Sequence, residues 1–363
     1  MGSMRRNTPI AVLAACLLAC ALAPAASARV TKAIWGPTEM PNGSSAFRVY
    51  KNLGVDVFQI QLQWDRTATT RPGKPTNPND RAYSWPSIVD DAVRGGRRNG
   101  IKVAILVKGS PDWSNAGRVF SWAPSNNAFA KFLTAASRRY KSVKHWMIWG
   151  EPNRAPSFQP LPKNSRVGPR RYATLLRAGY KALKRRSRKN IVIGANTTSI
   201  GDVMPNKFLR SMRLPNGKPP PLDWYGHNPF SYRFPRLSGG RPGLPGVRGL
   251  RDIGDTAVFA REVHNTYRRK YRRFRRRGPK LWLSEFTVSS DRPNRAFSFA
   301  VSRKQQARWL KAAYRIARKP YVSGLGWFNL HDEPVTTPRG LTTGLMTYEG
   351  VRKPAFRAYK RVR

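Results

Sequence analysis

The chain has 363 residues, 40% of them hydrophobic, which is enough to bury a large core in one domain or two. It carries 68 lysines and arginines against 18 aspartates and glutamates, a formal net charge of +50 at pH 7. With two cysteines in the whole chain, the composition excludes a small disulfide-rich scaffold.

The first 28 residues have the pattern of a secretory signal peptide. Arg5 and Arg6 precede an apolar run over 10–22, and an Ala-Ser-Ala cleavage site follows at 26–28. We therefore expect a secreted protein whose mature chain starts at residue 29, with residues 1–3 either a vector remnant or an alternative start. Cys16 and Cys20 both lie in this segment, so the mature chain has no thiol. The alternative is a lipid anchor at Cys20.

The charge is the most unusual feature of the composition. Without Arg5 and Arg6 the chain keeps 66 basic and 18 acidic residues, a formal +48, which would attract nucleic acid, acidic glycans or an anionic cell surface. The alternative is arginine enrichment from coding bias, spread over solvated helix faces. The densest run, 267–277, fits that alternative, because an apolar stripe at helical spacing predicts one helix with its arginines outside: Phe259, Val263, Tyr267, Tyr271 and Phe274.

Short apolar strands alternate with amphipathic helices through the mature chain. Strands are expected at 33–36, 57–64, 102–107, 146–149, 191–194, 222–227, 281–286 and 324–330. Helices are expected at 46–52, 86–99, 127–140, 169–187, 207–212, 259–274, 304–317 and from 353 onward. Eight strands separated by helices predict a single-domain (β/α)8 TIM barrel over 29–363, an α/β fold with long loops at 71–80 and 235–254.

Two glutamates stand at the ends of predicted strands. The apolar run 146–149 leads into Gly150 and Glu151, and the run 281–283 leads into Ser284 and Glu285. In such barrels the active site is built at the carboxyl ends of the strands. We therefore interpret Glu151 and Glu285 as a catalytic pair.

The strings around these residues carry a family resemblance. WGEPN ends the fourth strand, HNPF follows the sixth, SEF ends the seventh, and the eighth bears a tryptophan. Together they resemble clan A glycoside hydrolases, in particular retaining glycosidases of families 39 and 5. The resemblance implies that Glu151 is the general acid/base and Glu285 the nucleophile. The clan usually has asparagine before the acid/base, and Gly150 here implies an unusual sugar, a substitute donor or weak activity.

Seven further residues are candidates for binding the substrate. His227 would orient Glu285 or contact a hydroxyl, unless it is structural, and Trp327 resembles the clan's sugar-stacking platform. Trp35 and Trp64 either stack on sugar or belong to the core, and Asn153 either contacts sugar or caps its loop. Asp332, or its neighbour Glu333, would hold substrate hydroxyls or be a solvated loop charge. The strand-six tyrosine, Tyr225, completes the set.

No metal or cofactor is expected. The four histidines lack metal-ligand spacing, and neither a P-loop, a dinucleotide fingerprint nor a nucleophile elbow occurs in the sequence. Three functions stay open: a secreted retaining glycoside hydrolase acting on an oligo- or polysaccharide, a carbohydrate-binding barrel without turnover, and a polyanion-binding surface protein. For the first, the charge suggests an acidic or cell-surface glycan. No specific nucleic-acid partner is expected.

Overall fold

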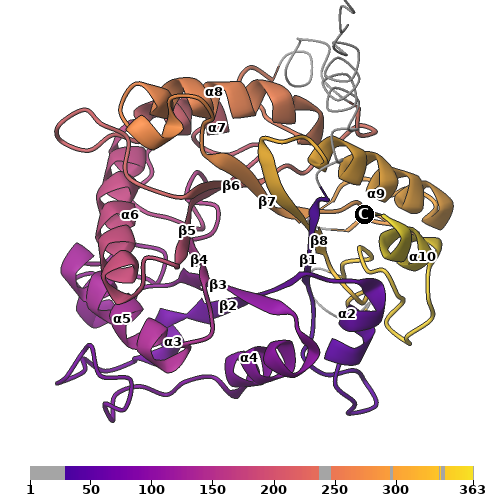
Figure 1. The fold of residues 1–363 in the computed structure, drawn as a ribbon, viewed down its shortest axis with the longest axis horizontal. Helices are drawn as coiled ribbons and strands as arrows, with labels where there is room; N and C mark the ends of the chain where they lie inside the picture. The colour runs from indigo at the N-terminus through magenta and orange to yellow at the C-terminus, as the bar shows by residue number, and fades with distance from the viewer. Residues whose placement is uncertain (1–28, 237–246, 295–296, 335, 337–339, 363) are drawn as a thin grey trace, which may run out of the picture.

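The computed structural model describes residues 29–236, 247–294, 297–334, 336 and 340–362. Eight parallel strands close into a barrel in chain order, β1 to β8, and helices surround it (Figure 1). The predicted single-domain (β/α)8 barrel is confirmed. The expected signal peptide and part of the expected loop at 235–254 lie outside the described residues.

The elements follow the predicted order with small shifts at their ends. The strands are β1 (Thr31–Trp35), β2 (Val57–Gln63), β3 (Lys102–Lys108), β4 (His145–Ile148), β5 (Ile191–Thr198), β6 (Trp224–Asn228), β7 (Lys280–Phe286) and β8 (Val322–Phe328). The helices are α2 (Phe47–Leu53), α3 (Trp64–Thr67), α4 (Ser87–Asn99), α5 (Asn126–Arg139), α6 (Val167–Arg186), α7 (Pro205–Ser211), α8 (Thr256–Arg268), α9 (Arg303–Ala317) and α10 (Pro354–Arg361).

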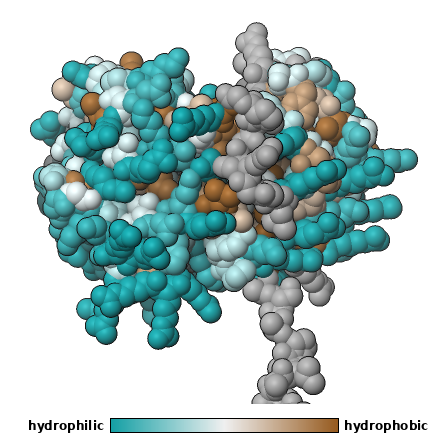
Figure 2. All heavy atoms as spheres, turned by 90° about the horizontal axis from the view of Figure 1, so that it is seen from above, coloured by the Kyte–Doolittle hydropathy of each residue, from teal (hydrophilic) through white to brown (hydrophobic). Residues whose placement is uncertain are grey.

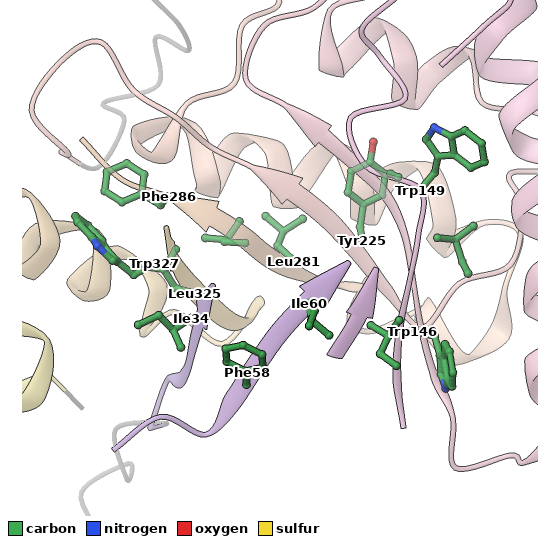
Figure 3. Close-up of a cluster of buried hydrophobic side chains, with 14 of the residues drawn as sticks. Ile34, Phe58, Ile60, Trp146, Trp149, Tyr225, Leu281, Phe286, Leu325 and Trp327 are labelled. Carbon is green, nitrogen blue, oxygen red and sulfur yellow. The ribbon is translucent and has the colours of Figure 1, made fainter. Parts of the chain in front are cut away.

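Side chains alternate between two buried layers, because successive residues of a strand point to opposite faces. A small inner cluster fills the barrel: Ala33, Trp35, Val57, Ala104, Leu106, Met147, Ile193 and Trp282. A larger outer cluster, part of it drawn in Figure 3, packs strands against helices and includes Ile34, Phe58, Ile60, Trp146, Leu281 and Leu325. Since strands are apolar on both faces, the barrel is a packed core and the open space lies at its end.

Several helix ends carry local signals that fix their positions. Ser302 and Gln305 form a capping box at the start of α9, which satisfies two backbone N–H groups. Gly54 and Gly100 follow α2 and α4 with φ of 69° and 71°, a left-handed conformation that terminates a helix and favours glycine. The capping box thus fixes where α9 begins, and the two glycines fix where the chain leaves α2 and α4 for the next strand.

The prediction of one basic helix over 259–274 is wrong in its second half. Helix α8 ends at Arg268, and a 3₁₀ helix, η4 (Arg272–Phe274), follows a turn. The hydroxyls of Tyr267 and Tyr271 donate to the carbonyls of Pro220 and Pro219, so the aromatic stripe stays packed against the core without a continuous helix, with Tyr271 partly buried. Arginines four residues apart repel each other along a helix, which also disfavours its continuation.

The outer surface is strongly hydrophilic. In Figure 2, where the molecule is seen from above relative to Figure 1, long hydrophilic side chains stand out around its outline. Of the helices within the described ranges, none combines the length and the apolar character needed to span a bilayer.

Candidate active site

A cavity of about 630 Å³ opens at the carboxyl ends of the strands. Residues from most of the strand ends line it, including Trp35, Gln61, Lys108, Glu151, Thr198, Glu285 and Phe328. The two glutamates predicted as a pair therefore face one space, although β4 and β7 lie on different sides of the barrel.

Glu151 is presented by an irregular backbone just beyond β4. Trp149 and Glu151 have φ of 63° and 50°, in the left-handed region that side chains other than glycine rarely adopt. The Trp149 indole turns outward and donates to the carbonyl of Ser157 at 2.7 Å. Strained backbone of this kind persists where neighbouring structure holds it and is concentrated at functional sites.

The neighbouring strand β5 holds this segment in place. Ala195 and Asn196 have φ of 73° and 45° and lie where the pairing of β5 with β6 shifts register, between Gly194 and Thr197. The Asn196 amide donates to the carbonyl of Trp149 at 2.8 Å, and the Asn196 carbonyl accepts from the Glu151 N–H at 3.0 Å. Two irregular strand ends therefore fix each other, and with them the backbone of Glu151.

A β-bulge directs Glu285 into the cavity. Leu283 pairs with Leu325 and Phe286 pairs with Trp327, so three residues of β7 match two of β8. Leu283 and Phe286 both belong to the outer cluster. The extra residue between them breaks the alternation, and Glu285 faces the cavity.

Asn228, at the end of β6, connects the two strand ends that carry the glutamates. Its amide donates to Oε1 of Glu151 at 3.3 Å, and its Oδ1 accepts from the hydroxyl of Ser284, the residue before Glu285. Asn228 is buried, so these bonds are shielded from water. The sequence interpretation missed it, although it belongs to the HNPF string and shares the inward face of β6 with Trp224.

Trp35 and Gln59 form the floor beneath the pair. The Trp35 indole and the Gln59 amide donate to the carbonyl of Ser284 at 2.9 and 2.8 Å. Gln59 also accepts from the Trp282 indole at 3.0 Å. Both residues line the cavity and hold the β7 bulge in place, and Gln59 was not among the predicted residues.

Cationic side chains lie beside the carboxylates. Arg154 forms an ion pair with Glu151 at 2.8 Å, and its side chain is 49% exposed. Lys108 lines the same cavity from the end of β3. These two groups add positive charge to the lining of the cavity.

His227 lies on the outer face of β6 and does not line the cavity. Its Nε2 donates to the carbonyl of Arg251 at 2.9 Å, which leaves Nδ1 to accept from the hydroxyl of Thr197 at 2.9 Å. Burial lowers the pKa of His227 to about 4, so the ring is neutral. These contacts support a structural role for His227 and not a contact with Glu285 or with substrate.

Trp327, Tyr225 and Trp64 also belong to the outer layer, with no exposed surface to offer a sugar. The Trp327 indole donates to the carbonyl of Thr343 at 3.1 Å, and its ring packs against Phe286 (Figure 3). The expected stacking role is therefore corrected to a core role. On β8 the aromatic side chain that lines the cavity is Phe328, one residue further on.

The remaining candidates are also displaced from the pair. Asn153 is fully buried, donates to the carbonyls of Thr198 and Val203, and accepts from the Thr198 N–H. These bonds hold its loop in place, which is the second of the two roles considered for it. Asp332 forms an ion pair with the buried Lys353 at 2.6 Å and lines an adjoining smaller cavity. Its neighbour Glu333 lines both cavities.

Gly150 lines the cavity beside Leu106. A Cβ at this position would lie 3.2 Å from Cδ2 of Leu106, the end of a flexible side chain. A larger residue therefore fits after a small movement of Leu106. Across the described ranges, His, Asp and Glu side chains form no group of three that could hold a metal ion.

Comparisons with protein-family models and with curated proteins find no match. Solved structures do match. A family 39 glycoside hydrolase from Bacteroides cellulosilyticus WH2 is 17% identical with a TM-score of 0.68, over 93% of this chain and 64% of that one. A glucosidase from Croceicoccus marinus is 15% identical with a TM-score of 0.64, over 92% of this chain and 67% of that one.

A monomeric beta-xylosidase from Caulobacter crescentus is 17% identical with a TM-score of 0.55, over 91% of this chain and 67% of that one. This chain thus spans about two thirds of the length of these proteins. At such identities the likeness concerns the fold. The chain has the closed (β/α)8 barrel seen in clan A glycoside hydrolase structures, among them members of family 39.

Proposed function

We propose that the protein is a secreted retaining glycoside hydrolase, with Glu151 as acid/base and Glu285 as nucleophile. One observation carries the proposal: glutamates from the ends of strands four and seven line one cavity at the carboxyl end of the barrel. Such a pair is what double displacement at an anomeric carbon requires. The barrel fold shared with clan A structures supports the assignment of roles.

In the first step the Glu285 carboxylate attacks the anomeric carbon while Glu151 donates a proton to the departing oxygen. In the second step Glu151 takes a proton from water, the water oxygen bonds to the anomeric carbon, and the ester to Glu285 breaks. Asn228 holds Glu151, and the bonds from Trp35 and Gln59 to Ser284 hold the bulge that presents Glu285. Both carboxylates are thereby oriented before substrate binds.

The cavity lining suggests the kind of substrate. Trp35 and Phe328 offer aromatic faces to the apolar side of a pyranose, and Phe230 with Phe297 forms an edge-to-face pair, at 5.7 Å between ring centres, on the rim. We propose a β-linked oligo- or polysaccharide. Lys108 and Arg154 could hold a carboxylate or sulfate on an acidic glycan. No cofactor takes part in this mechanism.

The test is chemical rescue of a nucleophile variant. Glu285→Gly should lose hydrolysis of aryl glycosides by at least about 10³-fold and regain part of it with azide, because azide can enter the vacated space. Proton NMR of the first wild-type product should show the anomeric configuration of the substrate. Glu39→Gln, at an exposed residue of the adjoining cavity, is the matched control and should keep its activity.

An inverted first product, or an azide-insensitive Glu285→Gly variant that retains wild-type turnover, would contradict the assignment. A second function, a carbohydrate-binding barrel without turnover, is favoured by Gly150, where the clan's asparagine is missing. Calorimetry that detects sugar binding by a protein inactive on a broad glycoside panel would select that second function.

A further inference from the structure

The charge of the molecule is unevenly distributed. In a parallel barrel each helix returns the chain to the amino-terminal end, so the turns between a helix and the next strand meet there, opposite the cavity. Taken together with the last residues of each helix and, at Lys102 and Lys280, the first residue of the next strand, these turns cover 51–56, 97–102, 138–144, 184–190, 210–223, 268–280 and 315–321. They hold 28 of the 68 lysines and arginines but two acidic residues, Asp56 and Asp223. We call this surface the basic end.

Acidic residues gather at the other end. Thirteen of the 18 lie at strand ends or in the segments that follow them: Glu39, Asp65, Asp80, Asp112, Glu151, Asp202, Asp252, Asp255, Glu285, Asp291, Asp332, Glu333 and Glu349. Arginine enrichment from coding bias acts equally on all parts of the sequence and predicts no such separation. The polarity of the molecule therefore needs another explanation.

The side chains of the basic end are available for contact. All but Arg138, Lys144, Lys184 and Arg213 of these lysines and arginines are exposed. The two acids neutralise only a small part of this charge. Asp223 pairs with Lys184 at 2.7 Å and with Arg273 at 3.2 Å, and Asp56 pairs with Arg29, which lies outside these turns. None of the large exposed apolar side chains in the described ranges belongs to these turns. A partner would be held by charge, without insertion of apolar groups.

The arrangement favours a planar partner. The turns are distributed around the whole barrel end, as the ring of helices in Figure 1 makes visible, and do not follow a single groove. A flat anionic surface can contact them together, whereas a linear polyanion would reach only some. Most of the groups are arginines, whose planar guanidinium binds phosphate through two hydrogen bonds.

We propose that the basic end docks on an anionic phospholipid bilayer and orients the cavity away from the membrane. Each lysine or arginine near such a surface adds attraction, which falls off within a Debye length of roughly 10 Å at 0.1 M salt. Binding and catalysis then use opposite ends of the barrel. The docking site is independent of the function proposed for the cavity.

The test is co-sedimentation of the purified protein with vesicles containing phosphatidylglycerol, compared with pure phosphatidylcholine. The protein is expected to bind the anionic vesicles but not the phosphatidylcholine vesicles. This binding should disappear as the salt concentration is raised. Replacement of Arg269, Arg272, Arg276 and Arg277 by glutamine should weaken vesicle binding more than about tenfold. These residues are exposed and none is in an ion pair within the described part of the chain.

The matched control removes the same charge elsewhere. Arg81, Arg166, Arg170 and Arg308 are exposed and lie outside these turns, so their replacement by glutamine should weaken binding less than about threefold. A second variant, with Arg185, Arg186, Arg188 and Lys189 replaced, repeats the test on the turn before β5. Circular dichroism checks that each variant is folded.

Equal losses in the variants and in the control would overturn the proposal, because total charge and not its position would then set the affinity. Binding to soluble polyphosphate or to DNA with no sedimentation on vesicles would overturn the lipid assignment. Vesicle-bound protein that still binds or hydrolyses a glycoside would support the orientation. Failure of every glycoside assay leaves the vesicle result interpretable, so the two proposals are tested separately.

Discussion

Asn228 is the residue on which the orientation of both carboxylates depends. It donates to Glu151 and accepts from Ser284 in a buried position, so its loss would free the Glu151 carboxylate and loosen the segment that presents Glu285. We expect Asn228→Ala to lower kcat by about 10- to 100-fold with a small change in KM, since misplaced groups weaken transition-state stabilisation.

Steady-state kinetics with an aryl glycoside would measure this effect. Thr197→Val is the control, because Thr197 lies on the adjacent strand and its hydroxyl contacts the outward-facing His227. That variant should lose stability and keep kcat. A normal kcat in a folded Asn228→Ala protein would show that the bridge is structural only.

Position 150, where clan A glycoside hydrolases usually have asparagine, allows the resemblance to that clan to be tested with a single substitution. Its φ is not in the left-handed region, and an added Cβ meets only Leu106, so Gly150→Asn should fold. An amide at this position would add a donor for a sugar hydroxyl, and we expect a several-fold rise in kcat/KM on some substrates. Kinetics unchanged on every accepted glycoside would show that this position does not contact the sugar.

At the scale of the element, the sequence predicted the order and type of the strands and helices but not which side chains face inward. Strands β6 and β8 are apolar or aromatic on both faces because helices cover one side and the barrel interior the other, so they show no alternation to interpret. The three candidates Tyr225, His227 and Trp327 were therefore assigned to the wrong face.

The positions of the irregular parts of the strands could not be predicted from the sequence either. The register shifts at Ala195–Asn196 and between Leu283 and Phe286 depend on pairing with a neighbouring strand that is distant in the chain. No local propensity encodes them. Glu151 and Glu285, which line the cavity, could nevertheless be singled out, because a carboxylate after an apolar run is itself a local signal.

Two adjacent aromatic residues at the end of β8, Trp327 and Phe328, test which side of the strand faces the cavity and which faces the helices. Phe328→Ala should raise KM severalfold with little change in stability, because Phe328 lines the cavity and is partly exposed. Trp327→Ala should cost about 3–5 kcal/mol of unfolding free energy, since the ring is fully buried in the outer cluster. Urea unfolding and substrate titration of both variants measure the two effects.

The opposite result, a stable Trp327→Ala protein with weakened substrate binding, would place Trp327 at the sugar and Phe328 in the core. The pair is informative because the two side chains are neighbours in the chain and differ in which side of the barrel they face. Any general effect of losing an aromatic ring is common to both variants.

At the scale of the whole molecule, two buried histidines make folding sensitive to acid. Burial lowers the pKa of both His145 and His227 to about 4. Below pH of about 6.5 the unfolded chain binds protons at these rings and the folded chain does not, so unfolding free energy falls until the pH nears about 4. Each could contribute up to about 3 kcal/mol to this loss.

Urea unfolding from pH 7 to pH 4 would measure the dependence. His227→Gln should flatten its slope in that window relative to the wild type, whatever stability the substitution itself costs, and His145→Gln should flatten it by a similar amount. An unchanged slope in both variants would assign the acid sensitivity to carboxylates instead.

The separation of charge between the two ends also governs how the protein would attach to a solid support. A cation-exchange bead should adsorb the molecule by its basic end, since that end presents a dense set of exposed lysines and arginines with few compensating acids. Every adsorbed molecule would then have the same orientation, with the mouth of the barrel facing the mobile phase. Immobilisation would need neither a tag nor chemical coupling, and salt alone would release the protein.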